Sequence, residues 1–445
     1  MIVFACGDYG IAGGVPGISM KCIARLSSAL LTPLLLPGWA LAAPSVPKTE
    51  TPLPQLAIYA AKGPPDACGP GCDRWIAIEG KIEPGSAARV ERFFRERKDT
   101  QRPIYFNSPG GAMDDSLAIG RLLRGRKAIG RVGRTVVDAC PGTQTDSACT
   151  FIKTTRDEVT ASIMTRGTVC GSACTFLLFG AVTREVAPDA FVAVHGAKIQ
   201  MEFRLNVNEK RREEAIAKAH SEADRLTFAY VEEMGISREL MTLADSISPE
   251  SLRVLTRQEL YRFRIDTRDF VETAWTLEKA QRPSVRKMAQ IKDGDGFRKL
   301  EWQLVCDSKV HARLAFVDEL SKDPAAVRIV AMTAGSAKSP QFSRFPVRFG
   351  AHEVWSAIIT PDAMKNFFAA PRLGIGQKTV LPDGKATSSF FEIETRGLES
   401  AWTQLSAACQ AAQAKAPGLK FLSPPALSPP SPQVSEGLPT PTPAK

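Results

Sequence analysis

Short apolar runs alternate with amphipathic helical segments between residues 75 and 194. Residues 75–80 and 103–106 have the composition of strands, and Ser86 is placed to cap a helix between them. Strands joined by crossover helices pair in parallel, because the helix returns the chain to the same end of the sheet. The sequence therefore predicts an α/β domain of parallel strands with crossover helices.

The same alternation returns further along this region. An amphipathic helix at 117–123 is followed by a possible strand at 135–137, and an apolar helix at 171–179 is followed by a strand at 192–194. A polar segment at 140–166 interrupts the pattern between them. After the last strand, residues 208–233 predict a charged helix, which either projects from the domain or lies on its surface.

A region with a different pattern follows. Four apolar segments there are typical of short strands, and a helix closes the region: 302–305, 328–332, 353–359, 390–394 and the helix 398–409. We therefore expect an α/β domain at 57–285 and a smaller β-rich domain at 286–415. The Pro- and Ser-rich residues 416–445 predict a disordered tail.

The start of the chain resembles an export signal. Residues 26–42 are apolar but interrupted by two prolines, follow Lys21 and Arg25, and end in a small-x-small motif after which cleavage is expected. A membrane-spanning helix needs about 20 apolar residues, so this segment is too short, and no later stretch qualifies. We therefore expect a leader and signal peptide at 1–42, a Pro-rich linker at 43–56 and a periplasmic mature chain. Both Met1 and Met20 fit as the start.

Eight cysteines remain after the expected cleavage, an even number that suits disulfides in an oxidising compartment. Proximity suggests the pairs 68–72, 140–149, 170–174 and 306–409, of which the last is the most persuasive. A zinc site is the competing interpretation, but the short spacings are C-x3-C and no histidine lies at ligand spacing from a cysteine pair. We expect neither a metal nor a cofactor.

The chain is basic, with a net charge of +10, but it contains no dense Lys/Arg block and only 7% aromatic residues. A nucleic-acid partner would need a concentrated basic patch, so the charge is better explained as a solvated surface. We do not expect nucleic acid as a partner.

Two stretches have residues that a core does not need. In Asn107-Ser108-Pro109-Gly110-Gly111, paired glycines follow a strand and leave backbone N–H groups accessible, as an oxyanion site requires. An ordinary turn is the alternative. In the second stretch, Ser172 stands among small residues at a helix start, where it is either a helix cap or a nucleophile.

His195 is the candidate base for that nucleophile. The chain has four histidines, and this one ends an apolar strand directly after the Ser172 helix. A lone histidine is more often structural, so the pairing is a hypothesis from order along the chain.

The order of these motifs resembles the Clp protease proteolytic subunit and its crotonase-like relatives, over roughly residues 74–268. The resemblance implies Ser172 as nucleophile, His195 as base and Gly110, Gly111 and the Ala173 amide as oxyanion donors. It also implies a third member that orients the histidine, for which Asp245 is the nearest match.

Asp266 is a poorer match for this third member, and Asp245 could equally be a helix cap. The cysteines beside Ser172 and the segment 140–166 depart from the cytoplasmic protease. The resemblance further implies a homo-oligomer.

We therefore predict a periplasmic serine peptidase that acts on a peptide or protein substrate through Ser172, His195 and Asp245. The rival prediction is a non-catalytic Clp-like binding or scaffold protein of the cell envelope, with the β-rich domain and the charged helix making contacts. An acyl-CoA crotonase is disfavoured, because those enzymes act in the cytoplasm and this chain carries an export signal.

Overall fold

The computed structural model describes residues 3–4, 55–97, 101–140, 143–201, 203, 207–278, 283–307, 311–321, 323, 325–335, 340, 342–343 and 345–415. The predicted signal segment, most of the predicted linker and the Pro-rich tail lie outside these residues. The chain divides into two compact units, the first containing residues 1–273 and 289–297 and the second containing 274–288 and 298–445. Each unit is described by itself below.

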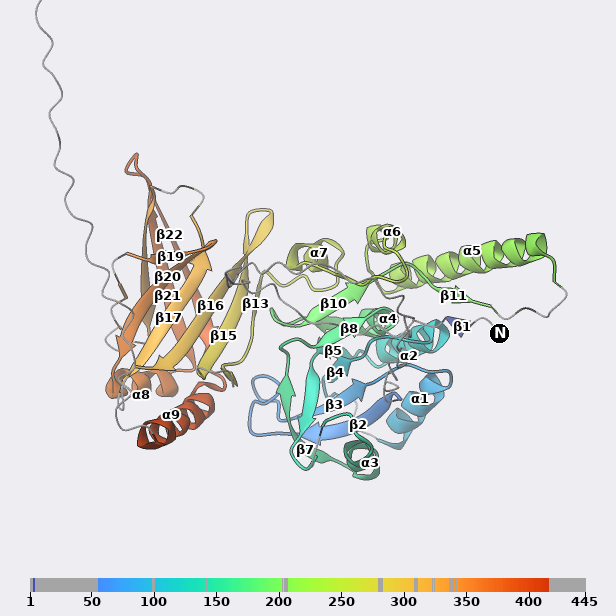
Figure 1. The fold of residues 1–445 in the computed structure, drawn as a ribbon, viewed down its shortest axis with the longest axis horizontal. Helices are drawn as coiled ribbons and strands as arrows, with labels where there is room; N and C mark the ends of the chain where they lie inside the picture. Colours follow the sequence, from blue (N-terminus) through green and yellow to red (C-terminus); the bar gives the residue numbers. More distant parts are fainter. Residues whose placement is uncertain are drawn as a thin grey trace, which may run out of the picture. The chain divides into compact units, whose positions relative to one another are not determined.

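The first unit is built on a seven-stranded sheet with the order β6-β7-β2-β3-β4-β5-β9 (Figure 1). Its strands are β2 (Ala57–Lys62), β3 (Arg74–Glu79), β4 (Ile104–Asn107), β5 (Ile129–Val132), β6 (Arg134–Val137), β7 (Val159–Met164) and β9 (Thr183–Glu185). The run β3-β4-β5-β9 is parallel, as is the β2–β7 pair, whereas β2–β3 and β6–β7 are antiparallel.

Helices connect the parallel strands. Helix α1 (Ser86–Glu96) joins β3 to β4, and α2 (Met113–Gly125) joins β4 to β5. This confirms the predicted α/β class with parallel strands and crossover helices. The predicted cap is wrong in detail: Gly85 is the N-cap of α1, and the buried Ser86 hydroxyl instead accepts a hydrogen bond from the Glu83 amide.

A second, smaller sheet has the order β12-β10-β8. It contains β8 (Val169–Gly171), β10 (Phe191–Val194) and β12 (Arg253–Val254), with β8 and β10 parallel. Its strands β8 and β10 end directly before Ser172 and His195. Helix α4 (Cys174–Gly180) follows β8 directly. The segment 140–166, predicted only as a polar interruption, contains α3 (Ser147–Thr155) and strand β7.

The rest of the first unit is mainly helical: α5 (Glu209–Glu233), α6 (Glu239–Asp245) and α7 (Arg257–Arg262), with the short strands β1 (Val3–Phe4), β11 (Ile199–Gln200) and β13 (Phe270–Glu272). The buried residues of α5 begin at Ala219, and its first ten residues are not buried. In Figure 1 the first half of α5 extends away from the seven-stranded sheet and has the short strand β11 near it, which favours the projecting helix of the two predicted alternatives.

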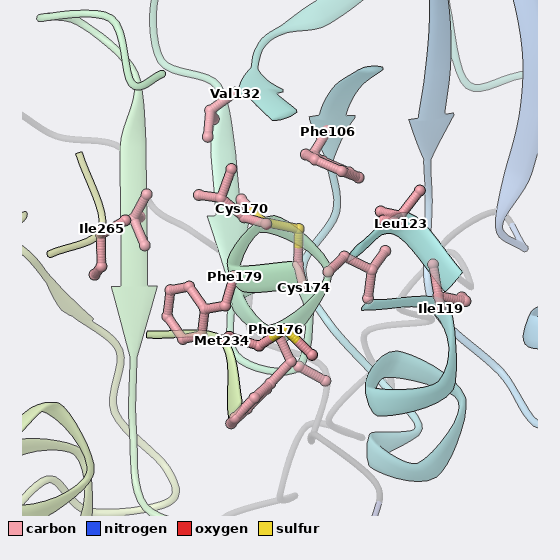
Figure 2. Packing of buried hydrophobic residues seen from close by; sticks show 14 of the residues in the cluster. Phe106, Ile119, Leu123, Val132, Cys170, Cys174, Phe176, Phe179, Met234 and Ile265 are labelled. Atoms are coloured by element: carbon pink, nitrogen blue, oxygen red, sulfur yellow. A yellow bond between two sulfur atoms is a disulfide. The ribbon is translucent and has the colours of Figure 1, made fainter. Parts of the chain in front are cut away.

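The hydrophobic core of the first unit surrounds α4, all seven residues of which are buried. Phe176 and Phe179 pack edge to face at 5.7 Å, and Leu123 of α2 and Phe106 of β4 belong to the same cluster (Figure 2). A helix without a polar side can only exist where it is covered on all sides. This explains why α4 contains no charged residue and only one polar side chain, Thr175.

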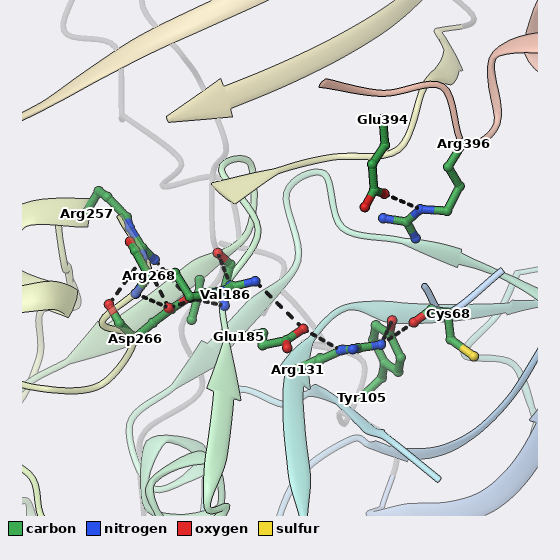
Figure 3. A network of polar contacts seen from close by, with 10 residues as sticks. All are labelled: Cys68, Tyr105, Arg131, Glu185, Val186, Arg257, Asp266, Arg268, Glu394 and Arg396. Carbon is green, nitrogen blue, oxygen red and sulfur yellow. Dashed lines mark hydrogen bonds and ion pairs between the residues drawn. The ribbon is translucent and has the colours of Figure 1, made fainter. Parts of the chain in front are cut away.

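Two buried polar networks stabilise this unit. Asp266 is 2% exposed, and Arg257 and Arg268 lie 2.8 and 2.6 Å from its carboxylate (Figure 3). Elsewhere the buried Glu79 carboxylate accepts from the Tyr59 hydroxyl at 2.7 Å and pairs with Lys153 of α3 at 3.1 Å. The second network ties the interrupting segment to the main sheet.

The second unit is β-rich, as predicted, and its strands pair antiparallel. Its elements are β14 (Thr276–Glu278), β17 (Ala312–Glu319), β18 (Val327–Thr333), β19 (Val347–Phe349), β20 (His352–Ile359), β21 (Arg372–Val380), β22 (Ala386–Glu394), α8 (Pro361–Ala369) and α9 (Leu398–Lys415). Strands β15 (Ser284–Asp293) and β16 (Gly296–Cys306) belong to it except for their residues within 289–297, which are part of the first unit. One sheet contains the order β15-β16-β17-β20-β19 and another β18-β21-β22. Trp302, Phe316 and Trp355 stack in its core.

Among the described side chains, disulfides join Cys68 to Cys72, Cys140 to Cys149, and Cys170 to Cys174. These are the three short pairs suggested by sequence proximity, and they suit a chain that folds in an oxidising compartment. Cys306 is also disulfide-bonded. The side chain of Cys409, its predicted partner, lies outside the described residues. No helix within the described ranges is long and apolar enough to cross a membrane.

Candidate active site

Ser172 lies in the turn between β8 and α4. Its backbone φ is +54°, in the left-handed region that residues with a side chain seldom adopt. Such a turn presents a side chain between the end of a strand and the start of a helix, which is the local geometry of many nucleophilic serines. The conformation marks Ser172 as a residue held in place by its surroundings.

The alternative role of Ser172 as a helix cap does not match the structure. The N-cap residue of α4 is Ala173, and no side chain caps this helix. The carbonyl oxygen of Ser172 accepts hydrogen bonds from the Thr175 amide at 3.0 Å and the Thr175 hydroxyl at 2.7 Å, while its amide donates to the Ala193 carbonyl at 2.8 Å. The turn is therefore fixed through the Ser172 backbone.

His195 directly follows β10, the strand to which the Ser172 amide is bonded. The ring is half-buried, and its Nδ1 lies 2.6 Å from the carbonyl oxygen of Gly196. A carbonyl oxygen can only accept, so this contact assigns the proton of the neutral ring to Nδ1 and leaves the lone pair on Nε2. That tautomer is the one in which Nε2 can act as a base.

Ser172, His195, Asp245, Gly111 and Ala173 line one pocket. The structure thus brings together five of the six site residues that the sequence predicts. Apolar side chains that the sequence did not single out also line it: Met113, Phe176, Leu240 and Met241. In the sequence these four residues show only the apolar pattern of core positions on three helices. That pattern does not distinguish the wall of a pocket from a packed interior.

Asp245 ends α6 and is exposed at the edge of this pocket. The Gly196 amide donates to the Ile247 carbonyl at 3.0 Å, which ties the segment after His195 to the segment after Asp245. Partial burial and the negative charge of Asp224 raise the pKa of the Asp245 carboxyl. The role of Asp245 in orienting the imidazole stays a prediction, and in the structure the Gly196 carbonyl contacts Nδ1.

Asp266, the poorer match for the orienting residue, is placed differently. It is buried between Arg257 and Arg268 and is not among the residues that line the pocket. Its carboxylate also accepts from the Val186 amide at 2.8 Å. These contacts give Asp266 a structural role.

The paired glycines pack against the Ser172 turn. A Cβ added to Gly110 would lie 2.8 Å from both the Ser172 Cβ and the Ala173 nitrogen. The Gly110 amide donates to the buried Ser108 hydroxyl at 3.1 Å, so it is already occupied. Among the described residues, no acceptor for the amides of Gly111 or Ala173 is found in the backbone hydrogen bonds. These two amides are therefore the better placed to receive an oxyanion.

Gly111 tolerates no side chain. Its φ is +142°, and an added Cβ would lie 1.9 Å from the carbonyl oxygen of Ile82. We expect Gly111→Ala to displace the turn and to slow any reaction that uses the Gly111 amide as an oxyanion donor by about 10²–10³-fold. The matched control is Gly125→Ala, because an added Cβ there meets nothing within 4 Å. Equal rates for both variants would contradict this placement.

The described residues contain no group of three or more His, Cys, Asp or Glu side chains arranged to hold a metal ion. The residues that line this pocket offer hydroxyl, imidazole, amide and carboxylate groups.

No family model matches the chain, and no curated protein matches it. Among solved structures, it is similar to invasion-associated protein B from Bartonella henselae, with 9% identity and a TM-score of 0.23 over 32% of this chain and 94% of that one. It is also similar to a mutant of a membrane-bound stomatin-specific protease, with 15% identity and a TM-score of 0.24 over 43% of this chain and 75% of that one. The assignment of the site therefore depends on its own geometry.

Proposed function

We propose that this chain is a periplasmic serine peptidase in which Ser172 is the nucleophile and His195 the general base. The observation that carries the proposal is the shared pocket, where a serine in a left-handed strand-to-helix turn and a histidine with its lone pair on Nε2 occur beside available backbone amides. These are the parts that acyl transfer needs. The disulfides agree with an oxidising compartment.

The reaction would follow the usual course of serine hydrolases. Ser172 Oγ attacks the peptide carbonyl carbon as its proton moves to His195 Nε2, and the amides of Gly111 and Ala173 stabilise the negative oxygen. The imidazolium then protonates the leaving amine, which gives an acyl-enzyme. Water, deprotonated by the same histidine, releases the acid and restores Ser172.

Within this proposal the imidazole needs an acceptor at Nδ1 to hold its orientation and to stabilise its cation. The Gly196 carbonyl meets that need in the structure, and Asp245 is the charged alternative at the same pocket. The apolar wall of Met113, Phe176, Leu240 and Met241 would receive part of a peptide or protein substrate. A homo-oligomer also belongs to this proposal.

A fluorophosphonate probe tests the function. In a competent site Ser172 Oγ forms a bond to phosphorus and displaces fluoride, so we expect labelling of the folded protein and none after unfolding in guanidinium chloride. Peptide mapping by mass spectrometry should place the label on Ser172. Absence of labelling, or a label at another serine, would contradict the proposal and favour the binding or scaffold protein.

A further inference from the structure

The disulfide between Cys170 and Cys174 brackets the candidate nucleophile. Cys170 lies in β8, two residues before Ser172, and Cys174 is the first residue of α4, two residues after it. Both cysteines are fully buried, with their Cα atoms 5.2 Å apart. Figure 2 shows the bond among the buried side chains of the core.

The strand side of the turn is held independently of this bond. The Ser108 amide donates to the Val169 carbonyl at 3.1 Å, and the Gly171 amide donates to the Ser108 carbonyl at 3.0 Å. These bonds fix the end of β8 beside the paired glycines. The helix side starts with Ala173, whose side chain makes no cap, and its polar contacts to the turn are the bonds from the Thr175 amide and hydroxyl to the Ser172 carbonyl.

The left-handed backbone conformation of Ser172 is unfavourable for a residue that carries a side chain. A left-handed φ suits glycine, whereas a side chain there crowds the backbone, and the chain would relax if its ends were released. A covalent link between the residues at either end of the turn prevents that relaxation. It fixes the separation of β8 and α4 at the turn where the strand ends and the helix begins.

We propose that the Cys170–Cys174 disulfide is a positioning element, which holds Ser172 in its left-handed turn so that the hydroxyl faces His195 and the oxyanion amides. This inference rests on the proposed function. It assigns the two cysteines to catalysis through Ser172 and not to general stabilisation of the fold.

The chain offers a matched control. The Cys68–Cys72 disulfide has the same sequence separation of 4 and a similar Cα–Cα distance of 5.0 Å. Because the two loops have equal length, the two bonds restrict the unfolded chain to the same extent. Neither Cys68 nor Cys72 lines the pocket that contains Ser172. A difference between the two deletions therefore reports on the Ser172 turn.

The test compares Cys170→Ala/Cys174→Ala with Cys68→Ala/Cys72→Ala in the full chain. We measure the rate constant of fluorophosphonate labelling, kcat and KM for a quenched fluorescent peptide, and the melting temperature. We expect labelling and kcat to fall about tenfold in the first variant with KM unchanged, which is the effect of a relaxed left-handed residue. The second variant should keep the wild-type labelling rate and kcat.

The outcomes separate this inference from the proposed function. If the wild type labels and the Cys170/Cys174 variant labels equally fast, the positioning role is wrong while the peptidase stands. If the wild type does not label, the function itself fails. Should the alanine variant not fold, Cys170→Val/Cys174→Ala refills the apolar volume without the bond. Failure of both to fold, while the Cys68/Cys72 variant folds, would assign the bond to folding and overturn the proposal.

Discussion

Replacing Ser172 by alanine is expected to reduce peptide hydrolysis by about 10⁴- to 10⁶-fold, because the acyl-enzyme can no longer form. The residual rate would come from the pocket and the two backbone amides, which still bind the substrate carbonyl. The measurement is kcat/KM for quenched fluorescent peptides and for a small activated ester. The fold should survive, since Ser172 holds its turn through its backbone amide and carbonyl.

A double variant shows whether Ser172 and His195 act as a unit. Groups that share one reaction step are not additive, so Ser172→Ala/His195→Ala should be no slower than Ser172→Ala alone. Independent contributions would multiply and would contradict the shared mechanism. Retention of more than about a tenth of the wild-type rate in Ser172→Ala would point to a different nucleophile.

The second large effect is expected on stability. Asp266→Ala should lower the free energy of unfolding by about 3–5 kcal/mol, because it leaves the buried Arg257 guanidinium without its carboxylate. The two side chains are 1% and 3% exposed and lie 2.8 Å apart (Figure 3). Thermal unfolding at pH 7 measures the loss. A decrease below about 1 kcal/mol would mean that Arg257 is compensated by its other contacts.

The same variant has a predictable pH dependence. Burial alone would raise the pKa of Asp266, but hydrogen bonds and charges from Arg268 and Arg257 hold it well below its usual range. A carboxyl with a lowered folded pKa stabilises fully above its unfolded pKa of about 3.9 and loses that stabilisation as the pH falls further. The difference in melting temperature between wild type and Asp266→Ala should therefore be complete at pH 7 and shrink below about pH 4.

The matched control for this pair is Asp269→Ala. The Asp269 side chain is 69% exposed and lies 3.6 Å from Lys292. Exposed ion pairs contribute little, so a change within about 0.5 kcal/mol is expected. If Asp269→Ala destabilised as much as Asp266→Ala, burial would not be the cause of the larger effect.

The fold class could be predicted because its signal is local. Apolar runs such as 104–106 and 192–194 are bounded by turn residues, and the helices between them have clear one-sided patterns. The sequence predicts the segment 140–166 only as a polar interruption, because the burial of β7 and of Lys153 depends on partners far along the chain. The buried residues of β7 do alternate, at Val159 and Ala161, but two such residues are too short a pattern to predict a strand.

The candidate site could be predicted only in part. Ser172 and His195 were found because small residues and a strand end surround them, and the structure brings both to one pocket. The contact of His195 with the Gly196 carbonyl could not be found, since a backbone acceptor has no sequence signature. For the same reason the sequence could not tell that the Gly110 amide is occupied by the Ser108 hydroxyl.

Complete burial of α4 has a consequence for how the pocket tolerates heat. A helix with no solvent-facing side cannot slide or tilt without moving the side chains that enclose it. Ser172 is attached directly to that helix, so its geometry cannot soften ahead of its neighbours. Under the proposed function, the Ser172 side of the site would therefore keep its geometry on warming until the core around α4 unfolds.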